Sequence, residues 1–356
     1  MPELTERLTK EAIELLIRLI KTPSFSREET ATAELIADFL QSHGAQPQRE
    51  GNNVWAVNKH FDAAKPTVLL NSHHDTVKPG TTWTYDPFGA VVEDEKLIGL
   101  GSNDAGGCAV SLLATFLYFY ERPDLPFNLI CAITAEEEIS GANGISSLLP
   151  RLGKIDVGIV GEPTQMDMAI AEKGLVVLDC TAHGQTGHAA RNEGENALYK
   201  ALSDIQWLQQ YRFPNSSELL GPVKMTVTQI QAGTQHNVVP DTCRFVVDVR
   251  TNEFYSNEEV VRTVQAHLKS EVVPRSVRLN SSRIDPDHVL VRKGVALGRK
   301  TYGSATMSDQ ALMPFSTVKM GPGDSARSHT PDEYIYLYEI RGGIKAYIEL
   351  LEGLQL

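Results

Sequence analysis

The feature that most constrains this chain is an apolar strand that runs into two histidines and an aspartate. Residues 67–70 read Thr-Val-Leu-Leu, and His73, His74 and Asp75 follow closely. Such a strand is typical of a buried parallel sheet, whose carboxyl edge delivers polar groups to a crevice. Because side chains alternate along a strand, we expect His73 and Asp75 to point one way and His74 the other. A neutral imidazole can bind a metal ion while its surroundings fix the tautomer, so His73 is a candidate ligand.

The first half of the chain alternates between helical and extended patterns. This alternation predicts an α/β domain with a mostly parallel central sheet. The spacing of apolar residues predicts helices over 5–20, 29–43 and about 107–120, strands over 53–58, 67–72, 127–134 and 156–160, and a hairpin over 89–101.

A second pattern begins near residue 175. It predicts strands over 175–182, 224–231, 242–250 and 277–280, and helices over 196–211 and 257–270. The order β-α-β-β-α-β is that of a ferredoxin-like α+β sandwich. From residue 285 the first pattern resumes and closes with a helix over 333–351. We therefore expect a domain formed by 1–174 and 285–356, with a small domain inserted at 175–284.

Composition excludes two classes of partner. The formal net charge of −12 argues against a nucleic-acid partner. No apolar run approaches the roughly 18 residues of a membrane span, and the N-terminus does not resemble a signal peptide. The four cysteines have no paired spacing, so we expect reduced thiols in a cytoplasmic protein.

Further acidic residues and one histidine complete a candidate site. Buried strand ends are costly places for charge unless a partner offsets it, and a divalent cation is the simplest partner. Two histidines and three carboxylates match a two-metal hydrolytic site with one bridging carboxylate, and a further carboxylate can serve as general base. The candidates beyond His73 are Asp104, the run Glu136-Glu137-Glu138, Glu162 and His329.

Each candidate also has a purely structural interpretation. Asp104 could cap the helix that follows it, and the glutamate run could be a solvated loop. Glu162 could be a turn residue before Pro163, and a single histidine such as His329 is more often structural than ligating. A serine or cysteine nucleophile is not supported, because the chain has no Gly-x-Ser-x-Gly motif and no cysteine beside a histidine.

Seven segments together resemble one enzyme family. They follow the family's order and span nearly the whole chain: residues 72–79, 85–88, 101–107, 134–138, 160–164, 184–190 and 237–240. The family is that of the zinc-dependent aminoacylases and carboxypeptidases, which includes acetylornithine deacetylase and succinyl-diaminopimelate desuccinylase. The resemblance implies a zinc-peptidase-type catalytic domain and makes the insert a lid or dimerisation domain.

The resemblance also assigns roles to the candidate residues. It implies two zinc ions per subunit, with Co²⁺ or Mn²⁺ as substitutes. One ion is held by His73 and Glu162, the other by Glu138 and His329, and Asp104 bridges them.

The same resemblance identifies residues that act without binding metal. Asp75 orients His73, and the general base falls on Glu137. The glutamate run leaves a second register open, in which Glu136 is the base and Glu137 the ligand.

The resemblance of the insert implies a homodimer. His188 matches a histidine that, in relatives, reaches the partner subunit's active site and stabilises an oxyanion. Asn237 and Arg250 match positions that contact substrate, with Arg250 suited to bidentate capture of a carboxylate. A structural salt bridge is the alternative for Arg250.

The expected substrate is an N-acyl amino acid. Some relatives that remove a dicarboxylic acyl group carry two adjacent arginines where this chain has Glu172-Lys173. Because Glu172 would repel a second carboxylate, we expect N-acetyl-L-ornithine or N-acetyl-L-citrulline, as in arginine biosynthesis. The alternatives are a succinyl-diaminopimelate desuccinylase, a dipeptidase or tripeptidase and, more remotely, a non-catalytic metal-binding protein.

Overall fold

The apolar strands of the first half lie side by side in one mixed sheet. In this computed structural model, which describes residues 2–191 and 193–356, three neighbouring strands run parallel: β6 (Asn128–Thr134), β3 (Thr67–His73) and β7 (Val157–Val160). The flanking strands are β1 (Gln48–Glu50), β2 (Asn53–Val57), β15 (Thr317–Lys319) and β8 (Met168–Glu172). Of these four flanking strands, β15 pairs parallel with β7. The pairs β1–β2, β2–β6 and β15–β8 are antiparallel. The predicted α/β class with a mostly parallel centre is confirmed.

The chain divides into two compact units. Unit 1 runs up to Ile170 and includes Ile284–Tyr302 and Ser308–Leu356, whereas unit 2 comprises Ala171–Arg283 and Gly303–Met307. The predicted boundaries fall close to these divisions. Gly303–Met307 differs, because it follows a segment of unit 1 in sequence but packs with unit 2.

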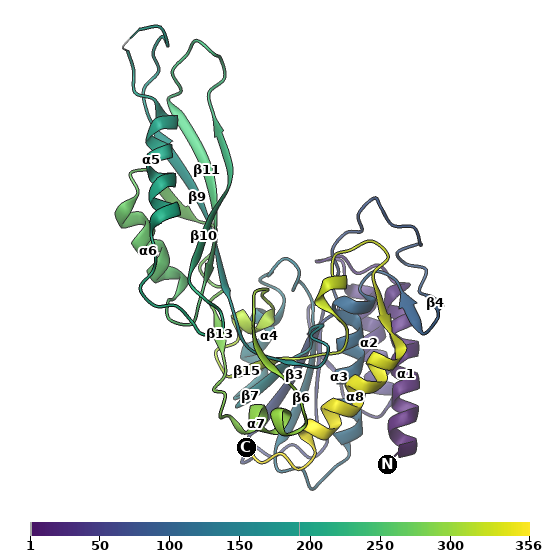
Figure 1. The fold of residues 1–356 in the computed structure, drawn as a ribbon. Coiled ribbons are helices and arrows are strands. Elements are labelled where there is room, and N and C mark those ends of the chain that lie inside the picture. The colour runs from purple at the N-terminus through teal and green to yellow at the C-terminus, as the bar shows by residue number, and fades with distance from the viewer. Residues whose placement is uncertain (1, 192) are drawn as a thin grey trace. The chain divides into compact units, whose positions relative to one another are not determined.

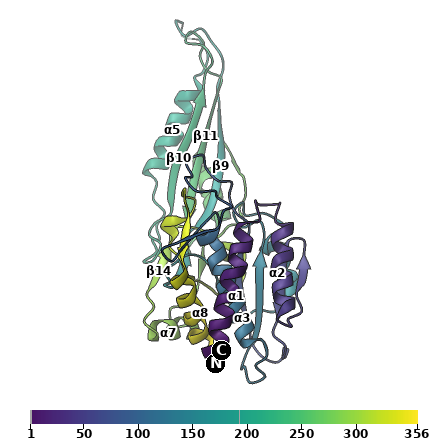
Figure 2. The ribbon, with the colours of Figure 1, turned by 90° about the vertical axis from the view of Figure 1, so that its right-hand side faces the viewer.

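Helices cover both faces of the sheet in unit 1. α3 (Gly107–Tyr120) is buried along its whole length, as expected for a helix that is apolar all round. It packs against α1 (Pro2–Ile20) and α8 (Leu337–Leu351), as Figures 1 and 2 show. α4 (Ile145–Leu152) contributes Leu148 to a cluster with Leu69 of β3. The remaining helices of the unit are α2 (Thr30–Ser42) and α7 (Val289–Ala296).

The predicted hairpin forms part of a small separate sheet. β4 (Val91–Glu93) and β5 (Lys96–Ile98) pair antiparallel, and β16 (Tyr334–Tyr336) adds to β5. The predicted helix over 333–351 therefore begins later, at Leu337, because residues 334–336 are extended and hydrogen-bonded to β5.

Unit 2 has the predicted ferredoxin-like topology. Two helices and four strands follow in the expected order: β9 (Gly174–His183), α5 (Ala197–Gln210), β10 (Lys224–Ala232), β11 (Thr242–Thr251), α6 (Asn257–His267) and β12 (Glu271–Pro274). The antiparallel sheet has the order β10-β11-β9-β12, and both helices lie on one face of it (Figure 1). The short strands β13 (Ser282–Arg283) and β14 (Thr301–Ser304) both pair with β8.

The last predicted strand of the insert is wrong. Residues 277–280 are not extended in a ladder, and β12 instead lies at Glu271–Pro274, opposite Leu178–Thr181 of β9. Val277 packs against the core of unit 2, which explains the apolar signal there. The carbonyls of Val277 and Leu279 accept hydrogen bonds from the Asn257 side chain, so this segment is held as a loop.

Two expectations from composition can be compared with the structure. All four cysteines are buried and free. Across residues 2–191 and 193–356, no helix has the length and apolar character required to cross a membrane.

Phe245 tests how far unit 2 depends on its core. Its side chain is 1% exposed on β11, so Phe245→Ala should lower the free energy of unfolding by about 3–5 kcal/mol. Urea denaturation followed by circular dichroism measures the change. Val273→Thr is the control, because Val273 is 51% exposed and threonine keeps the β-branched shape. Equal losses in both variants would contradict this description of the core.

Candidate metal centre

Three neighbouring strands bring acidic and histidine side chains to one edge of the sheet. β6, β3 and β7 run parallel, so their carboxyl ends meet there. β3 ends in His73, Glu137 and Glu138 follow β6, and Glu162 follows β7. Two loops complete the cluster: the turn η1 (Ser102–Gly106) before α3 carries Asp104, and the loop after η3 (Ser325–Arg327) carries His329. All of these residues belong to unit 1.

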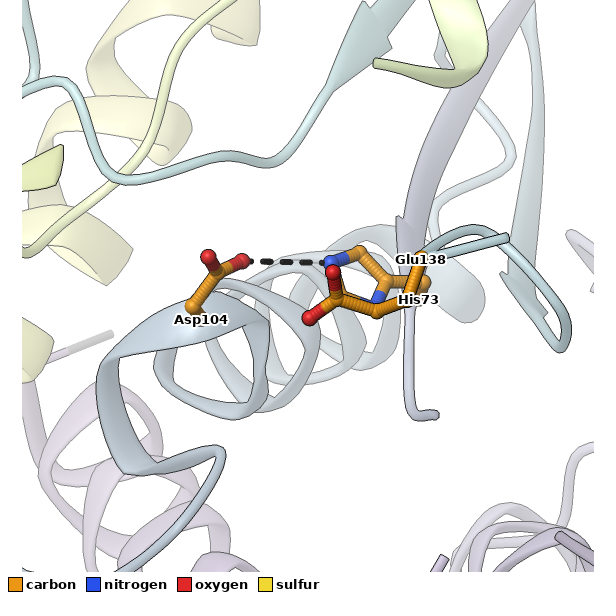
Figure 3. Close-up of side chains that lie close together, drawn as sticks. All are labelled: His73, Asp104 and Glu138. Atoms are coloured by element: carbon orange, nitrogen blue, oxygen red, sulfur yellow. Dashed lines mark hydrogen bonds and ion pairs between the residues drawn. The ribbon is translucent and has the colours of Figure 1, made fainter. Parts of the chain in front are cut away.

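His73 lies at the centre of the cluster and is 1% exposed. Its Nδ1 is 3.0 Å from the Asp75 carbonyl oxygen, to which it can donate a hydrogen bond. Its Nε2 is 3.3 Å from Asp104 Oδ1 and 3.6 Å from Glu162 Oε1. Figure 3 marks the contact between His73 and Asp104 with a dashed line. A donating Nδ1 leaves the lone pair of a neutral ring on Nε2, which faces the carboxylates. The ring is therefore oriented as a metal ligand would be.

Asp104 lies between the two histidines. Its Oδ1 faces His73 and its Oδ2 is 3.6 Å from His329 Nε2. His329 Nε2 is also 3.0 Å from Glu138 Oε2. In Figure 3 Glu138 lies beside the ring of His73. One carboxylate thus has an oxygen directed at each imidazole, which is the arrangement that a bridging ligand requires.

Asp75 fixes both sides of the cluster. Its Oδ1 accepts the backbone N–H of Glu137 at 3.0 Å, and its Oδ2 accepts that of Glu138 at 3.2 Å. Ser26 Oγ donates to Oδ2 at 2.7 Å. Although burial raises the pKa of Asp75, the contacts with His73 and these donors hold it below its usual range. β3 ends before Asp75, so a loop rather than strand alternation sets its position.

The three glutamates of the run do not face the same way. The Glu136 carboxylate accepts hydrogen bonds from the side chain and backbone N–H of Asn143, at 2.8 and 3.3 Å. Glu137 Oε2 lies 3.9 Å from His73 Nε2, and Glu138 contacts His329. The geometry therefore favours the register that places Glu137 and Glu138, and not Glu136, in the cluster.

Crowding of buried carboxylates perturbs their acidity. Burial, reinforced by neighbouring carboxylates, raises the pKa of Glu137 well above its usual range despite the opposing effect of His73. Burial likewise raises the pKa of Glu162 to about 8. The hydrogen bond to Glu138 raises the pKa of His329 to about 9. So much like charge in one place is favourable only when cations offset it.

The donor set fits divalent metal ions. Imidazole nitrogens and carboxylate oxygens bind Zn²⁺ at about 2.0–2.2 Å, so two ligands of one ion lie roughly 3 Å apart. The observed separations of 3.0–3.6 Å are close to that spacing. Among the described residues, one ligand atom each of His73, Asp104 and Glu138 lie within 4.8 Å of one another. The same holds for His73, Glu137 and Glu162.

Two buried carboxylates near the cluster were not predicted. Glu333 is 2% exposed and accepts hydrogen bonds from backbone N–H groups of the turn that carries Asp104. Asp309 in η2 (Asp309–Leu312) accepts a hydrogen bond from Thr134 Oγ1 at 2.8 Å, and burial raises its pKa to about 6. A single acidic residue in a polar loop gives no local signal, so sequence reasoning had no basis for finding either.

The other predicted residues belong to unit 2. A backbone bridge joins His188 to Val238, which places His188 and Asn237 on neighbouring loops. Arg250 pairs bidentately with Asp248, at 2.9 and 3.0 Å, as its structural interpretation requires. Glu172 is fully buried. The functional roles of these residues stay predictions.

Comparison with known sequences identifies relatives. Residues 170–276 match the family described as the peptidase dimerisation domain. A succinyl-diaminopimelate desuccinylase of Paracoccus denitrificans is 30% identical over 271 residues, covering 71% of this chain and 70% of the relative. The enzyme of the same name from Blochmanniella pennsylvanica is 30% identical over 287 residues, covering 74% of each chain.

Comparison with solved structures identifies the same fold. A tripeptidase from Staphylococcus aureus has a TM-score of 0.78 at 18% identity and 98% coverage of both chains. The YxeP protein of Bacillus subtilis, described as a dinuclear metal-binding peptidase of the M20 family, has a TM-score of 0.72 at 18% identity. The match covers 98% of this chain and 99% of the YxeP chain.

His74 provides a pH test of the packing beside the cluster. As predicted, it faces away from the metal ligands: Nε2 lies 3.0 Å from the Asn52 carbonyl oxygen and Nδ1 lies 2.9 Å from Thr32 Oγ1. Burial lowers the pKa of His74 from 6.5 to about 4. The contribution of the neutral His74 ring to the free energy of unfolding is therefore fully present above pH 6.5. As the pH falls towards 4, the unfolded chain takes up a proton that the folded protein does not, and this stability is lost.

The comparison is between metal-free wild type and His74→Gln, which cannot titrate at this position. The free energy of unfolding of the wild type, relative to the variant, should decrease by at most about 1.4 kcal/mol per pH unit between pH 6.5 and 4. Urea denaturation at several pH values measures this difference. A difference that stays constant across the range would show that His74 does not titrate as described.

Proposed function

The chain belongs to the M20 family of metal-dependent amide hydrolases, and from this premise we propose that it removes the acyl group of an N-acyl amino acid at a dinuclear metal centre. The observation that carries the proposal is Asp104, whose two carboxylate oxygens lie 3.3 Å from His73 Nε2 and 3.6 Å from His329 Nε2. A carboxylate between two imidazoles is suited to bridging two divalent ions.

We assign one ion to His73 and Glu162 and the other to Glu138 and His329, with Asp104 shared. Zinc is the ion we propose, because borderline nitrogen and oxygen donors suit it, and Co²⁺ or Mn²⁺ can replace it. Such ions, when bound, polarise the scissile carbonyl and make a water molecule more acidic.

Glu137 is the proposed general base. Its carboxylate lies among the ligands without being needed as one, and Asp75 holds its backbone. In the proposed reaction Glu137 takes the proton of the attacking water and delivers it to the leaving amine. In the protein without metal, burial raises the pKa of Glu137 well above its usual range, and bound cations would oppose that shift and favour the carboxylate form that accepts a proton.

We further propose a homodimer that forms through unit 2, which contains nearly all of the segment that matches the dimerisation domain family. In this proposal His188 donates a hydrogen bond to the oxyanion in the active site of the partner subunit. Asn237 lies on the loop next to that of His188 and would contact the same substrate. Arg250 would capture the substrate carboxylate only by exchanging its present partner, Asp248.

The names of the sequence relatives favour N-succinyl-L,L-diaminopimelate as the substrate. The two 30% identical relatives described above carry the name succinyl-diaminopimelate desuccinylase. The sequence-based prediction favoured N-acetyl-L-ornithine or N-acetyl-L-citrulline and gave this substrate as an alternative, and the names of the relatives support the alternative better.

N-acetyl-L-ornithine or N-acetyl-L-citrulline is the second candidate. The argument in its favour comes from the resemblance described above, which matches Glu172-Lys173 to the two adjacent arginines of some relatives that remove a dicarboxylic acyl group. Because Glu172 is fully buried, it would influence substrate choice through its charge and not by direct contact with the substrate. A dipeptide is the third candidate, since it presents the same amide chemistry.

Glu137→Gln tests the chemistry. The variant should lose roughly 10²–10⁴-fold in kcat while keeping its metal content and fold, because glutamine cannot accept the proton. Amine release and metal analysis on the same samples measure both quantities. Glu136→Gln is the matched control, since the Glu136 carboxylate faces Asn143, and it should retain kcat within a few-fold. Loss of turnover in the control alone would assign the base to Glu136.

A substrate panel tests specificity. Zinc-loaded enzyme should release amine fastest from N-succinyl-L,L-diaminopimelate among a set that includes N-acetyl-ornithine, N-acetyl-citrulline, N-succinyl-ornithine and simple dipeptides. Turnover confined to the ornithine and citrulline compounds would instead support the second candidate. Turnover of dipeptides alone would leave the amide chemistry standing and reject both acyl amino acids.

A further inference from the structure

Two loops that are far apart in sequence meet at the metal ligands. The turn from Gly101 to Asp104 supplies one ligand, and the segment from Asp324 to Glu333 supplies His329. The Asn103 side chain joins these loops from within: its Nδ2 donates to the Asp324 carbonyl oxygen at 3.0 Å, and its Oδ1 accepts the Asp324 N–H at 3.0 Å. Asn103 is fully buried, whereas Asp324 is partly exposed.

Glu333 holds the same turn from the other end of the second loop. One carboxylate oxygen, Oε1, accepts the backbone N–H of Asn103 at 2.8 Å and that of Asp104 at 2.9 Å. The other, Oε2, accepts the N–H of Gly101 at 3.2 Å. Both carboxyl oxygens of Glu333 therefore accept backbone N–H groups of this one turn.

The turn needs such support because its backbone is irregular. Asp104 has φ −117° and ψ 99°, so it does not belong to the helix that follows. The side chain of Asp104 must nevertheless present one oxygen to His73 and the other to His329. A small rotation of the turn would break one of these two alignments.

We propose that Glu333 is a positioning residue for the metal centre: by accepting three backbone N–H groups of the Gly101–Asp104 turn, it fixes the bridging carboxylate in the orientation that serves both metal ions. Glu333 lies four residues after His329, so one loop supplies a ligand to the second ion and the carboxylate that orients the bridge. This proposal rests on the dinuclear centre of the proposed function.

Glu333→Gln is the variant that tests the proposal. Glutamine has nearly the same size, but its amide group places an N–H against a backbone N–H where the carboxylate accepted a hydrogen bond. We expect the affinity for Zn²⁺ to fall by roughly 10–100-fold at both binding steps, because both ions share Asp104. Titration of the metal-free protein with Zn²⁺, in competition with a chelator of known affinity, measures this change without any turnover assay.

Asp204→Asn is the matched control. The Asp204 carboxylate in unit 2 is also buried and accepts the backbone N–H groups of Lys269 and Ser270, at 3.1 and 2.8 Å. We expect this variant to lose thermal stability while its Zn²⁺ affinity stays within about twofold of the wild type. If it loses as much Zn²⁺ affinity as Glu333→Gln, the effect is a general loss of stability and the proposal is wrong.

Hydrogen exchange of the wild type tests the proposal even if Glu333→Gln does not fold. If Glu333 holds the turn before metal binds, the N–H groups of Asn103 and Asp104 exchange slowly in metal-free protein. Fast exchange there would overturn the proposal. A wild type that binds no Zn²⁺ would overturn the proposed function together with this inference. Normal Zn²⁺ binding by both wild type and Glu333→Gln would overturn the role of Glu333 alone.

Discussion

The arrangement of the site depends on a single buried carboxylate. Asp75 lies against the ring of His73 and accepts the backbone N–H groups of Glu137 and Glu138. It therefore links the end of β3 to the loop after the neighbouring strand β6. Both hydrogen bonds end on the carboxylate of Asp75, which is fully buried, and breaking them would leave that carboxylate without two of its donors. The proposed base and a proposed ligand are thus held relative to the central histidine by one residue.

The electrostatics of the site describe a centre that requires cations. Burial raises the pKa of Glu162 to about 8 and that of Asp309 to about 6, and it raises the pKa of Glu137 well above its usual range. These shifts mean that burial without compensating charge disfavours the ionised carboxylates, and neighbouring carboxylates add to the effect. Such a cluster lowers the stability of the metal-free protein and favours uptake of divalent ions.

Support for the ligands comes from both ends of the chain. β3 and the turn of Asp104 lie in the first third of the sequence, whereas His329, Asp309 and Glu333 come from the last quarter. Unit 2 is inserted between these parts, and it has its own sheet and its own hydrophobic core. Segments before and after the insertion therefore supply the side chains of one cluster, all of them in unit 1.

The sequence by itself determined the α/β class, the ferredoxin-like order of the insert and most of the candidate ligands, because apolar periodicity and strand ends are local patterns. Tertiary structure alone decided which glutamates of the run face His73, since Asn143 holds Glu136 away. It also decided that the last strand of the insert lies at Glu271–Pro274, where it pairs with β9. The tertiary structure likewise places Asp309 and Glu333 near the site. The contact of Glu136 with Asn143 spans only seven residues, whereas the other outcomes depend on contacts between segments far apart in sequence, which no local pattern encodes.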